Sequence, residues 1–177
     1  PFLKVIAKPV TVIDEDILTI LDDMMETMYH ANGIGLAATQ IAIDKRLIVM
    51  DCGKTKYETQ NISEEEYDEK IKDEQFEPFP IKMINPEIIS LGKNLEEREE
   101  GCLSIPGYNA KIKRPSSLKV KYTDENKKDK IIDAEGLLAT CIQHEIDHLN
   151  GILFIDHLSK LKREIILKKA IKEYSKN

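Results

Sequence analysis

Two histidines four residues apart flank a glutamate in the stretch 143–151, where His144, Glu145 and His148 form the pattern His-Glu-x-x-His. On an α-helix, side chains at this spacing share one face about 6 Å apart along the axis, so both imidazoles can reach one divalent ion. The carboxylate then lies beside water whose pKa such an ion lowers to about 7. The pattern predicts a metallohydrolase centre. On its own, it is also compatible with a charged amphipathic helix that carries two surface histidines.

A catalytic metal centre of this kind usually has three protein ligands and water, so a third ligand must be found. A thermolysin-like peptidase would use a downstream glutamate, and Glu164 and Glu173 are available. Both glutamates lie in a lysine-rich segment that is typical of an exposed helix. A metzincin would need histidine at position 154, where the chain has Phe154.

The cysteines offer another source of the third ligand. Cys141 would lie on the same helix but about 10 Å along the axis from His148, so we expect it to pack rather than to bind the ion. Cys102 follows Gly101 and precedes Pro106, which constrain the backbone without adding bulk. A loop or strand end of this kind can present one thiolate.

Three separated blocks of the sequence resemble the signature motifs of peptide deformylases. They are Gly-Ile-Gly-Leu-Ala-Ala-Thr-Gln at 33–40, Glu-Gly-Cys-Leu-Ser at 100–104 and Gln-His-Glu-Ile-Asp-His at 143–148. They occur in the family's order without a substitution at a defining position, and the similarity covers nearly the whole chain. The resemblance implies a hydrolase that removes the formyl group from N-formylmethionine of newly synthesised polypeptides and releases formate. The alternatives are a His-Glu-x-x-His zinc metallopeptidase and, outside enzymes, a structural zinc module.

The resemblance also assigns roles to individual residues. It implies that Cys102, His144 and His148 hold the metal, that Glu145 is the general base, and that the Gln40 amide and the backbone N–H of Leu103 stabilise the oxyanion. The expected substrate-binding residues are Ile34, Gly35, Leu36, Gly101, Leu137 and Cys141, with Ile34 and Leu36 lining the substrate's side chains. Position 109 is Asn109, where many family members have arginine, which puts any contact of that arginine in doubt.

The metal itself is not fixed by the ligand types. A Cys-His-His site accepts Fe²⁺, Zn²⁺, Ni²⁺ or Co²⁺, and the resemblance implies Fe²⁺ in the cell.

Composition places the chain among soluble globular proteins. Its 177 residues are 41% hydrophobic and 33% charged, which suits one catalytic domain spanning 1–177. No apolar run approaches the length of about 20 residues that crosses a bilayer, and nothing resembles a signal peptide. Three widely spaced cysteines indicate reduced thiols. We expect a cytoplasmic protein without membrane or DNA partners. The opening at Pro1 resembles the family's start a few residues in, so a short native start is expected to be missing.

Hydrophobic periodicity predicts both helices and strands, and the resemblance implies an α+β fold in which mixed or antiparallel sheets pack around the His-Glu-x-x-His helix. Helices are expected at 14–29, 137–150 and 158–174, and strands at 46–50, from 81, at 118–122 and at 131–134. The last expected helix has apolar residues at 158, 161, 165, 166 and 170.

Two segments have opposite charge. Residues 58–77 carry a net charge of −7 and are expected to form a solvated insertion loop of unknown role. Residues 160–177 carry a net charge of +5 in a chain whose total is −6. This basic C-terminal helix is either a solvated surface or, as the resemblance implies, an attachment to the ribosome near its exit tunnel.

Overall fold

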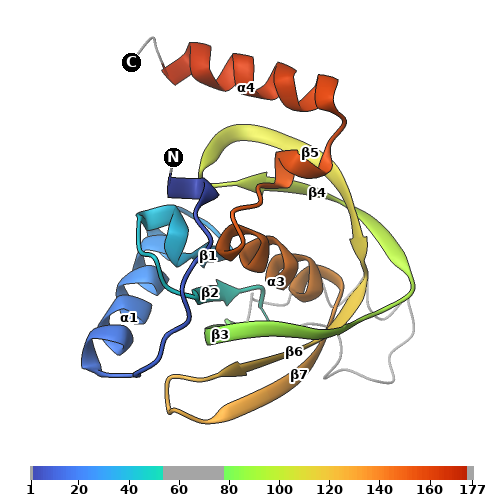
Figure 1. The fold of residues 1–177 in the computed structure, drawn as a ribbon. Coiled ribbons are helices and arrows are strands. Elements are labelled where there is room, and N and C mark those ends of the chain that lie inside the picture. Colours follow the sequence, from blue (N-terminus) through green and yellow to red (C-terminus); the bar gives the residue numbers. More distant parts are fainter. Residues whose placement is uncertain (1, 54–77, 175–177) are drawn as a thin grey trace.

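The computed structural model describes residues 2–53 and 78–174, which form an α+β fold (Figure 1). The helices are α1 (Glu15–His30), α3 (Gly136–Leu149) and α4 (Lys160–Tyr174), with 3-10 turns η1 (Phe2–Lys4), η2 (Ala38–Ile41) and η4 (Phe154–His157). The strands are β1 (Gly35–Ala37), β2 (Leu47–Asp51), β3 (Pro80–Leu91), β4 (Leu95–Cys102), β5 (Ile105–Pro115), β6 (Ser117–Thr123) and β7 (Asp129–Glu135). The predicted class is confirmed. The acidic insertion at 58–77 lies outside the described residues.

The first helix starts and ends where its sequence indicates. The Asp14 side chain caps α1 by accepting the N–H of Ile17 at 3.0 Å, and the acidic first turn suits the helix dipole. The chain leaves the helix through a hydrogen bond from the N–H of Gly33 to the carbonyl of Met28. The residues that α1 buries are those of its apolar stripe: Ile17, Leu21, Met24, Met25 and Met28.

The main sheet is antiparallel, with strand order β1-β2-β3-β6-β7. Strand β2 is buried along its whole length because both of its faces are covered. Leu47 and Val49 pack with the residues of α1, whereas Ile48 and Met50 pack with those of α3. Among the described strands, β1 lies at the edge of this sheet, and its residues Gly35 to Ala37 pair with β2.

Figure 1 shows α3 between this sheet and the two-stranded sheet of β4 and β5. The expected helix at 137–150 is confirmed to within one residue at each end. Its C-terminal end is held by the N-terminal segment, because the N–H of Ala7 donates to the carbonyl of Leu149 at 2.8 Å. A side chain on Gly151 would meet the carbonyl oxygen of Lys4 at 2.7 Å, so this crossing requires glycine.

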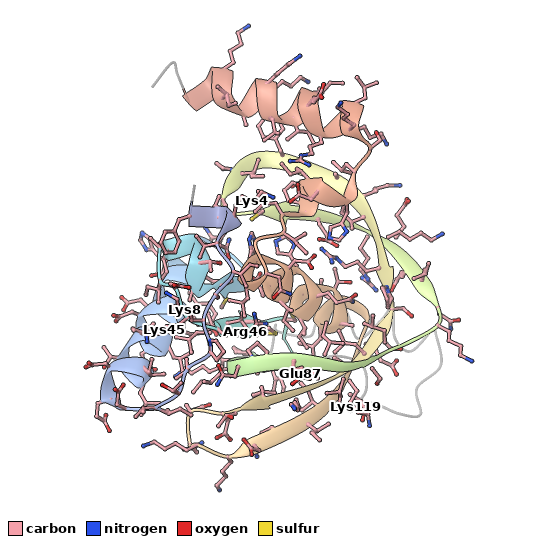
Figure 2. The ribbon with its side chains drawn as sticks, viewed as in Figure 1. Lys4, Lys8, Lys45, Arg46, Glu87 and Lys119 are labelled. Atoms are coloured by element: carbon pink, nitrogen blue, oxygen red, sulfur yellow. The ribbon has the colours of Figure 1, made fainter. Side chains whose placement is uncertain are left out.

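Two lysines of the N-terminal segment, Lys4 and Lys8 in Figure 2, form ion pairs with other parts of the fold. Lys4 forms an ion pair with Asp156 of η4. Lys8 pairs with Asp44, and its carbonyl accepts the N–H of Arg46 at 2.9 Å. The segment before α1 therefore runs across the ends of β2 and α3.

The last expected helix, at 158–174, is confirmed apart from its start. Helix α4 begins two residues later than expected, because Leu158 still belongs to the end of η4. Leu161 and Ile165 are 69% and 45% exposed, and the residues that pack inward are Leu158, Ile166, Leu167 and Ala170. Within residues 160–172 of this helix none is fully buried, and a few partly buried residues pack against the small cluster around η4 and β5. No helix in the described ranges is long and apolar enough to cross a membrane.

The end of β2 is organised by the buried carboxylate of Asp51, which is 2% exposed. It accepts hydrogen bonds from the Tyr29 hydroxyl at 2.5 Å, the N–H of Gly53 at 3.0 Å and the N–H of Phe79 at 2.9 Å. Burial raises the pKa of Asp51, but these three donors outweigh it and hold the pKa below its ordinary value. The carboxylate thereby joins α1, β2 and the chain that enters β3.

We expect Asp51→Asn to lower the free energy of unfolding by about 1–3 kcal/mol at pH 7. The asparagine side chain has no charge, and its NH₂ group would face the N–H and O–H donors that the carboxylate accepts. The folded-state pKa of Asp51 lies below the unfolded value of about 3.9, so its stabilisation is present above that pH and is lost as the pH falls through the folded-state pKa. Urea unfolding of both proteins across pH is the measurement. Tyr29→Phe, which removes one donor, should cost less. A gap between wild type and Asp51→Asn that widens in acid would contradict this role.

Candidate active site

The structure brings together the three residues expected to bind a metal. Cys102 ends β4, and His144 and His148 lie one turn apart on α3. Their ligand atoms all lie within 4.8 Å of one another, and the Cys102 sulfur is 3.2 Å from Nε2 of His148. Within residues 2–53 and 78–174, this is the one group of three or more such side chains close enough to share an ion. Of the two rival third ligands, Glu164 is exposed on α4 and outside the group, and the side chain of Glu173 lies outside the described part of the structure.

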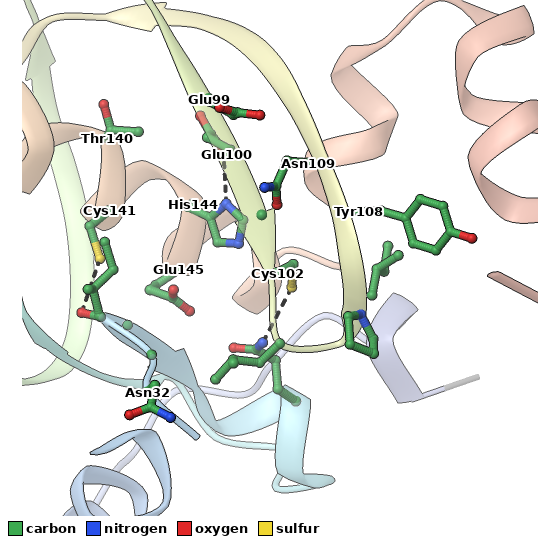
Figure 3. A pocket seen from close by; sticks show the side chains of 18 of the residues that line it. Asn32, Glu99, Glu100, Cys102, Tyr108, Asn109, Thr140, Cys141, His144 and Glu145 are labelled. Atoms are coloured by element: carbon green, nitrogen blue, oxygen red, sulfur yellow. Dashed lines mark hydrogen bonds and ion pairs between the residues drawn. The ribbon is translucent and has the colours of Figure 1, made fainter. Parts of the chain in front are cut away.

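His144 is held by a buried carboxylate that sequence reasoning assigned no role. Its Nδ1 lies 2.9 Å from Oε2 of Glu100, so Nδ1 carries the proton and Nε2 is left for a metal (Figure 3). On its other side the His144 ring stacks on Phe154, with ring centroids 6.2 Å apart. Phe154 thus supports the site at the position where a metzincin would have a ligand.

Glu100 is in turn paired with Arg114 of β5, which sequence reasoning also missed. The guanidinium donates to both carboxylate oxygens, at 2.7 and 3.1 Å, and to Asp147 of α3 at 2.8 Å. Asp147 also lies 2.7 Å from Nε2 of His157. Strand alternation could have indicated Glu100, because it shares a strand face with Cys102 two residues later. Arg114 could not be found this way, since its partners lie on two other elements.

The surroundings of the two imidazoles are unequal. Burial lowers the pKa of His144, but hydrogen bonds to Cys102 and Glu100 outweigh it and raise the pKa to about 10. Burial and the nearby His144 and Arg114 lower the pKa of His148 to about 3. The site therefore attracts positive charge at His144 Nε2, where a divalent cation would replace the proton. The donor set and its charge both fit a metal ion.

Glu145 points into the pocket beside these ligands. Its Oε2 is buried and has no hydrogen-bond partner in the described part of the chain. Burial raises the pKa of Glu145 to about 7, and the charge of Glu100 adds to this effect against the opposing effects of His144 and Arg114. A carboxyl group with this pKa can both accept and donate a proton near neutral pH.

The glycine-rich motif lets α3 approach β1. A Cβ atom at Gly35 would lie 2.4 Å from Oε1 of Glu145 and 2.7 Å from the sulfur of Cys141. Gly35 therefore leaves the space in which the Glu145 carboxylate lies. Any larger residue would have to displace that carboxylate.

Gln40, on η2, is directed at the metal ligands. Its Oε1 accepts the N–H of Ala37 at 2.8 Å, which fixes the amide orientation. Its Nε2 lies 3.1 Å from the hydroxyl of Ser104 and 3.6 Å from the sulfur of Cys102. Leu103, the other expected oxyanion residue, follows Cys102 directly and lines the same pocket.

A cavity of about 420 Å³ opens beside the ligands (Figure 3). Five of the six expected substrate-binding residues line it: Ile34, Gly35, Gly101, Leu137 and Cys141. Asn109 also lines it, opposite Gly101, where a Cβ atom would lie 2.3 Å from the Asn109 side-chain oxygen. Gly101 thus leaves room for the Asn109 side chain, at the position where many members of the resembling family have arginine.

The expectation that Leu36 lines the substrate's side chains is wrong. Leu36 is 3% exposed and packs in the cluster under α1, away from the cavity. Gly35 faces α3, so the alternation of β1 turns Leu36 to the opposite face of the sheet. Ile34 precedes the strand, so it does not follow that alternation and its side chain remains at the cavity.

Comparison with known proteins accounts for this arrangement. The family model described as Polypeptide deformylase matches residues 1–164. The chain belongs to the polypeptide deformylase family. A peptide deformylase of Methylocella silvestris is 47% identical over 167 residues, which cover 94% of this chain and 77% of that protein. The crystal structure of a peptide deformylase from Ehrlichia chaffeensis is 38% identical and has a TM-score of 0.84, covering 99% of this chain and 92% of that one. A structure of the Ehrlichia chaffeensis deformylase in complex with actinonin has a TM-score of 0.81 at 39% identity, covering 97% and 91%.

In this deformylase site, we expect Glu100→Gln to weaken metal affinity about 10- to 100-fold, because an amide holds Nδ1 of His144 less firmly and leaves Arg114 without its charge partner. Competition with a chelator measures the affinity. Glu99→Gln is the matched control, since Glu99 is the exposed neighbour on the same strand. Equal affinities for the Glu100 and Glu99 variants would show that the carboxylate does not support the ligand.

Proposed function

We propose that the chain removes the formyl group from N-formylmethionine at the start of newly synthesised polypeptides and releases formate, using the site described above. The family match over residues 1–164 supports this reaction. The observation that carries the residue assignment is the Cys102, His144 and His148 group with Glu145 beside it, whose Oε2 has no hydrogen-bond partner among the described residues.

In this proposal Cys102, His144 and His148 hold one divalent ion, with Fe²⁺ as the metal in the cell. A thiolate and two imidazoles suit Fe²⁺, and also Zn²⁺, Ni²⁺ or Co²⁺ in purified protein. When bound, the ion supplies Lewis acidity, which makes water nucleophilic near neutral pH and polarises the formyl oxygen.

Glu145 acts as the general base and then as the general acid. Its free Oε2 accepts a proton from the attacking water, and the same oxygen passes that proton to the departing amine of methionine. Both proton transfers need a group whose pKa lies between those of an ordinary carboxylate and the amine. Burial raises the pKa of Glu145 in that direction. Gly35 keeps the carboxylate at the pocket wall.

The developing negative charge on the formyl oxygen is met by donors on two elements. Gln40 contributes its amide, whose other end is fixed by the N–H of Ala37. Leu103 contributes its backbone N–H. Donors that are oriented before the reaction avoid the cost of reorganisation in the transition state.

The methionine side chain occupies the apolar part of the cavity, formed by Ile34, Leu137, Cys141 and the His144 ring. The peptide backbone that follows pairs with the edge of β1 and runs past Gly101. Gly35 on β1 and Gly101 each allow the substrate backbone to approach closely. The shape of the cavity recognises the methionine side chain, and polar contacts recognise the formyl group. Neither contact involves the residues that follow the methionine, so those residues can vary.

The rival metallopeptidase needs a glutamate as third ligand. Glu164 is on α4 and outside the ligand group, whereas Cys102 is within it. A structural zinc module would not need a free carboxylate or a cavity beside the ligands. Both rivals are less consistent with the site than a deformylase.

We expect the metal-loaded chain to release formate from formyl-Met-Ala-Ser and not to cleave casein, and Glu145→Gln to lower turnover by at least about two orders of magnitude. The variant should keep its metal, because Glu145 is not a ligand in this proposal. Formate release, metal content and thermal unfolding are measured on the same samples. Near-wild-type turnover of Glu145→Gln would exclude it as the base, and casein cleavage without formate release would favour the peptidase.

We also propose that the chain works in the cytoplasm and binds the ribosome near its exit tunnel through α4. The helix is held by one side, and its exposed lysines include Lys160, Lys162, Lys168, Lys169 and Lys172. In a chain with a net charge of −6, this helix is where a polyanion would be attracted. An enzyme acting on the first residue of a nascent chain gains from residing beside its exit.

We expect reversal of Lys162, Lys169 and Lys172 to glutamate to weaken ribosome co-sedimentation while leaving activity on a short formyl peptide intact. The charge variant is preferable to deletion, since α4 packs on η4 next to Phe154. The matched control reverses three exposed turn lysines, Lys93, Lys127 and Lys128. Binding of the wild type should fall with salt, because phosphate contacts release counterions. Equal pelleting of both variants and the wild type would show that α4 is only a solvated surface.

A further inference from the structure

The turn that connects β4 to β5 consists of Leu103 and Ser104. The residues that flank the turn, Cys102 and Ile105, pair with each other across the two strands. Leu103 lines the cavity, whereas Ser104 is partly buried and is not part of the cavity wall. The Ser104 hydroxyl instead lies 3.1 Å from Nε2 of Gln40, which is on η2. Ser104 therefore contacts a residue assigned to the oxyanion without itself facing the cavity.

The side-chain amide of Gln40 is held at both of its ends. The N–H of Ala37 can only donate, so the atom that faces it at 2.8 Å is Oε1, and the NH₂ group lies at the other end of the amide. The nitrogen of that group lies 3.1 Å from the hydroxyl oxygen of Ser104 and 3.6 Å from the sulfur of Cys102. An NH₂ group has two hydrogens, so it can donate one to each acceptor. The bond to Ser104 thus leaves the second N–H on the side of the metal ligand.

Ser104 makes two contacts that a substitution can separate. Its backbone N–H donates to the sulfur of Cys102 at 3.4 Å, and its hydroxyl accepts from Gln40. Alanine at position 104 would keep the first contact and remove the second. Glutamine is among the side chains that lose the most rotamer freedom when they are fixed. Without the hydroxyl, the Gln40 amide would regain part of that freedom.

We propose that Ser104 is a positioning residue for the reaction, because its hydroxyl holds the Gln40 amide with one N–H oriented toward the formyl oxygen. This inference rests on the proposed function, in which Gln40 meets the developing negative charge. A donor that is oriented before the reaction avoids the cost of reorganisation when the charge forms. The turn at 103–104 then serves both oxyanion donors, since Leu103 supplies its own N–H and Ser104 acts through Gln40.

The first test measures the kinetics of the zinc-loaded full chain on formyl-Met-Ala-Ser. We expect Ser104→Ala to lower kcat about tenfold, less than the roughly hundredfold loss that removal of an oxyanion donor causes, with KM nearly unchanged. Ser104→Thr keeps a hydroxyl and should restore most of the activity. In a Gln40→Ala background, Ser104→Ala should have no further effect, because the two residues act as one unit. Ser116→Ala is the matched control, since it removes a hydroxyl that bonds the carbonyl of Asn94 outside the cavity.

The second test does not depend on activity. In NMR spectra of the isotope-labelled, zinc-loaded chain, the side-chain NH₂ signals of Gln40 are identified by their loss in Gln40→Ala. We expect Ser104→Ala to shift these signals and to speed their exchange with solvent. The NH₂ signals of Gln143 should not change, because that group donates to the carbonyls of Pro115 and Ala139. Metal content should also stay the same, since the backbone N–H to Cys102 is kept.

Unmoved Gln40 signals in Ser104→Ala would overturn the proposal. So would an equal loss of kcat on Ser104→Ala in the wild-type and Gln40→Ala backgrounds, because the serine would then act independently of Gln40. A wild type that releases no formate would instead contradict the proposed function, and the NH₂ signals would still show whether Ser104 holds Gln40.

Discussion

The interaction on which the site depends is the buried ion pair between Glu100 and Arg114. It joins β4 to β5, and through His144 and Asp147 it joins both strands to α3. A buried charge without its partner costs about 3–5 kcal/mol, so the hairpin and the helix are held in the one arrangement that satisfies all four groups. Cys102 lies two residues after Glu100, and this arrangement brings its sulfur to His148. The ligand geometry is therefore set by charges that do not themselves touch the metal.

The same ion pair explains why the pKa values of the two carboxylates in this site, Glu100 and Glu145, differ. Glu100 is buried, which alone would raise its pKa, but the hydrogen bonds from His144 and Arg114 outweigh burial and lower it. Glu145 is buried without such donors, and its pKa rises to about 7. One carboxylate thus stays charged and orients a ligand, while the other is free to exchange protons. Gly35 maintains the difference by leaving Glu145 space without offering it a side-chain partner.

The features that the sequence predicted were those encoded locally. The period of α1, the spacing of His144 and His148 and the glycine next to Cys102 each lie within one element, and the structure has them as expected. The errors in the sequence-based predictions lie at positions whose burial or conformation depends on neighbouring elements of the fold. Leu36 is turned inward because Gly35 faces α3, and α4 begins later than expected because Leu158 still belongs to the end of η4. The role of Arg114 depends on two partners distant in sequence, which no periodicity reveals.

The three cysteines illustrate the same limit in chemical terms, because only their surroundings give them different properties. The Cys102 sulfur accepts the N–H of Ser104 at 3.4 Å and faces the Gln40 amide at 3.6 Å, so these two neighbours are hydrogen-bond donors. The Cys141 sulfur instead faces a carbonyl oxygen and the Glu145 carboxylate, which disfavour a thiolate. A cysteine on α3, the helix that carries both histidine ligands, is therefore not a metal ligand by its position alone. The sulfur that can bind a cation is the one placed among N–H groups, and β4 supplies that position by ending where η2 approaches it.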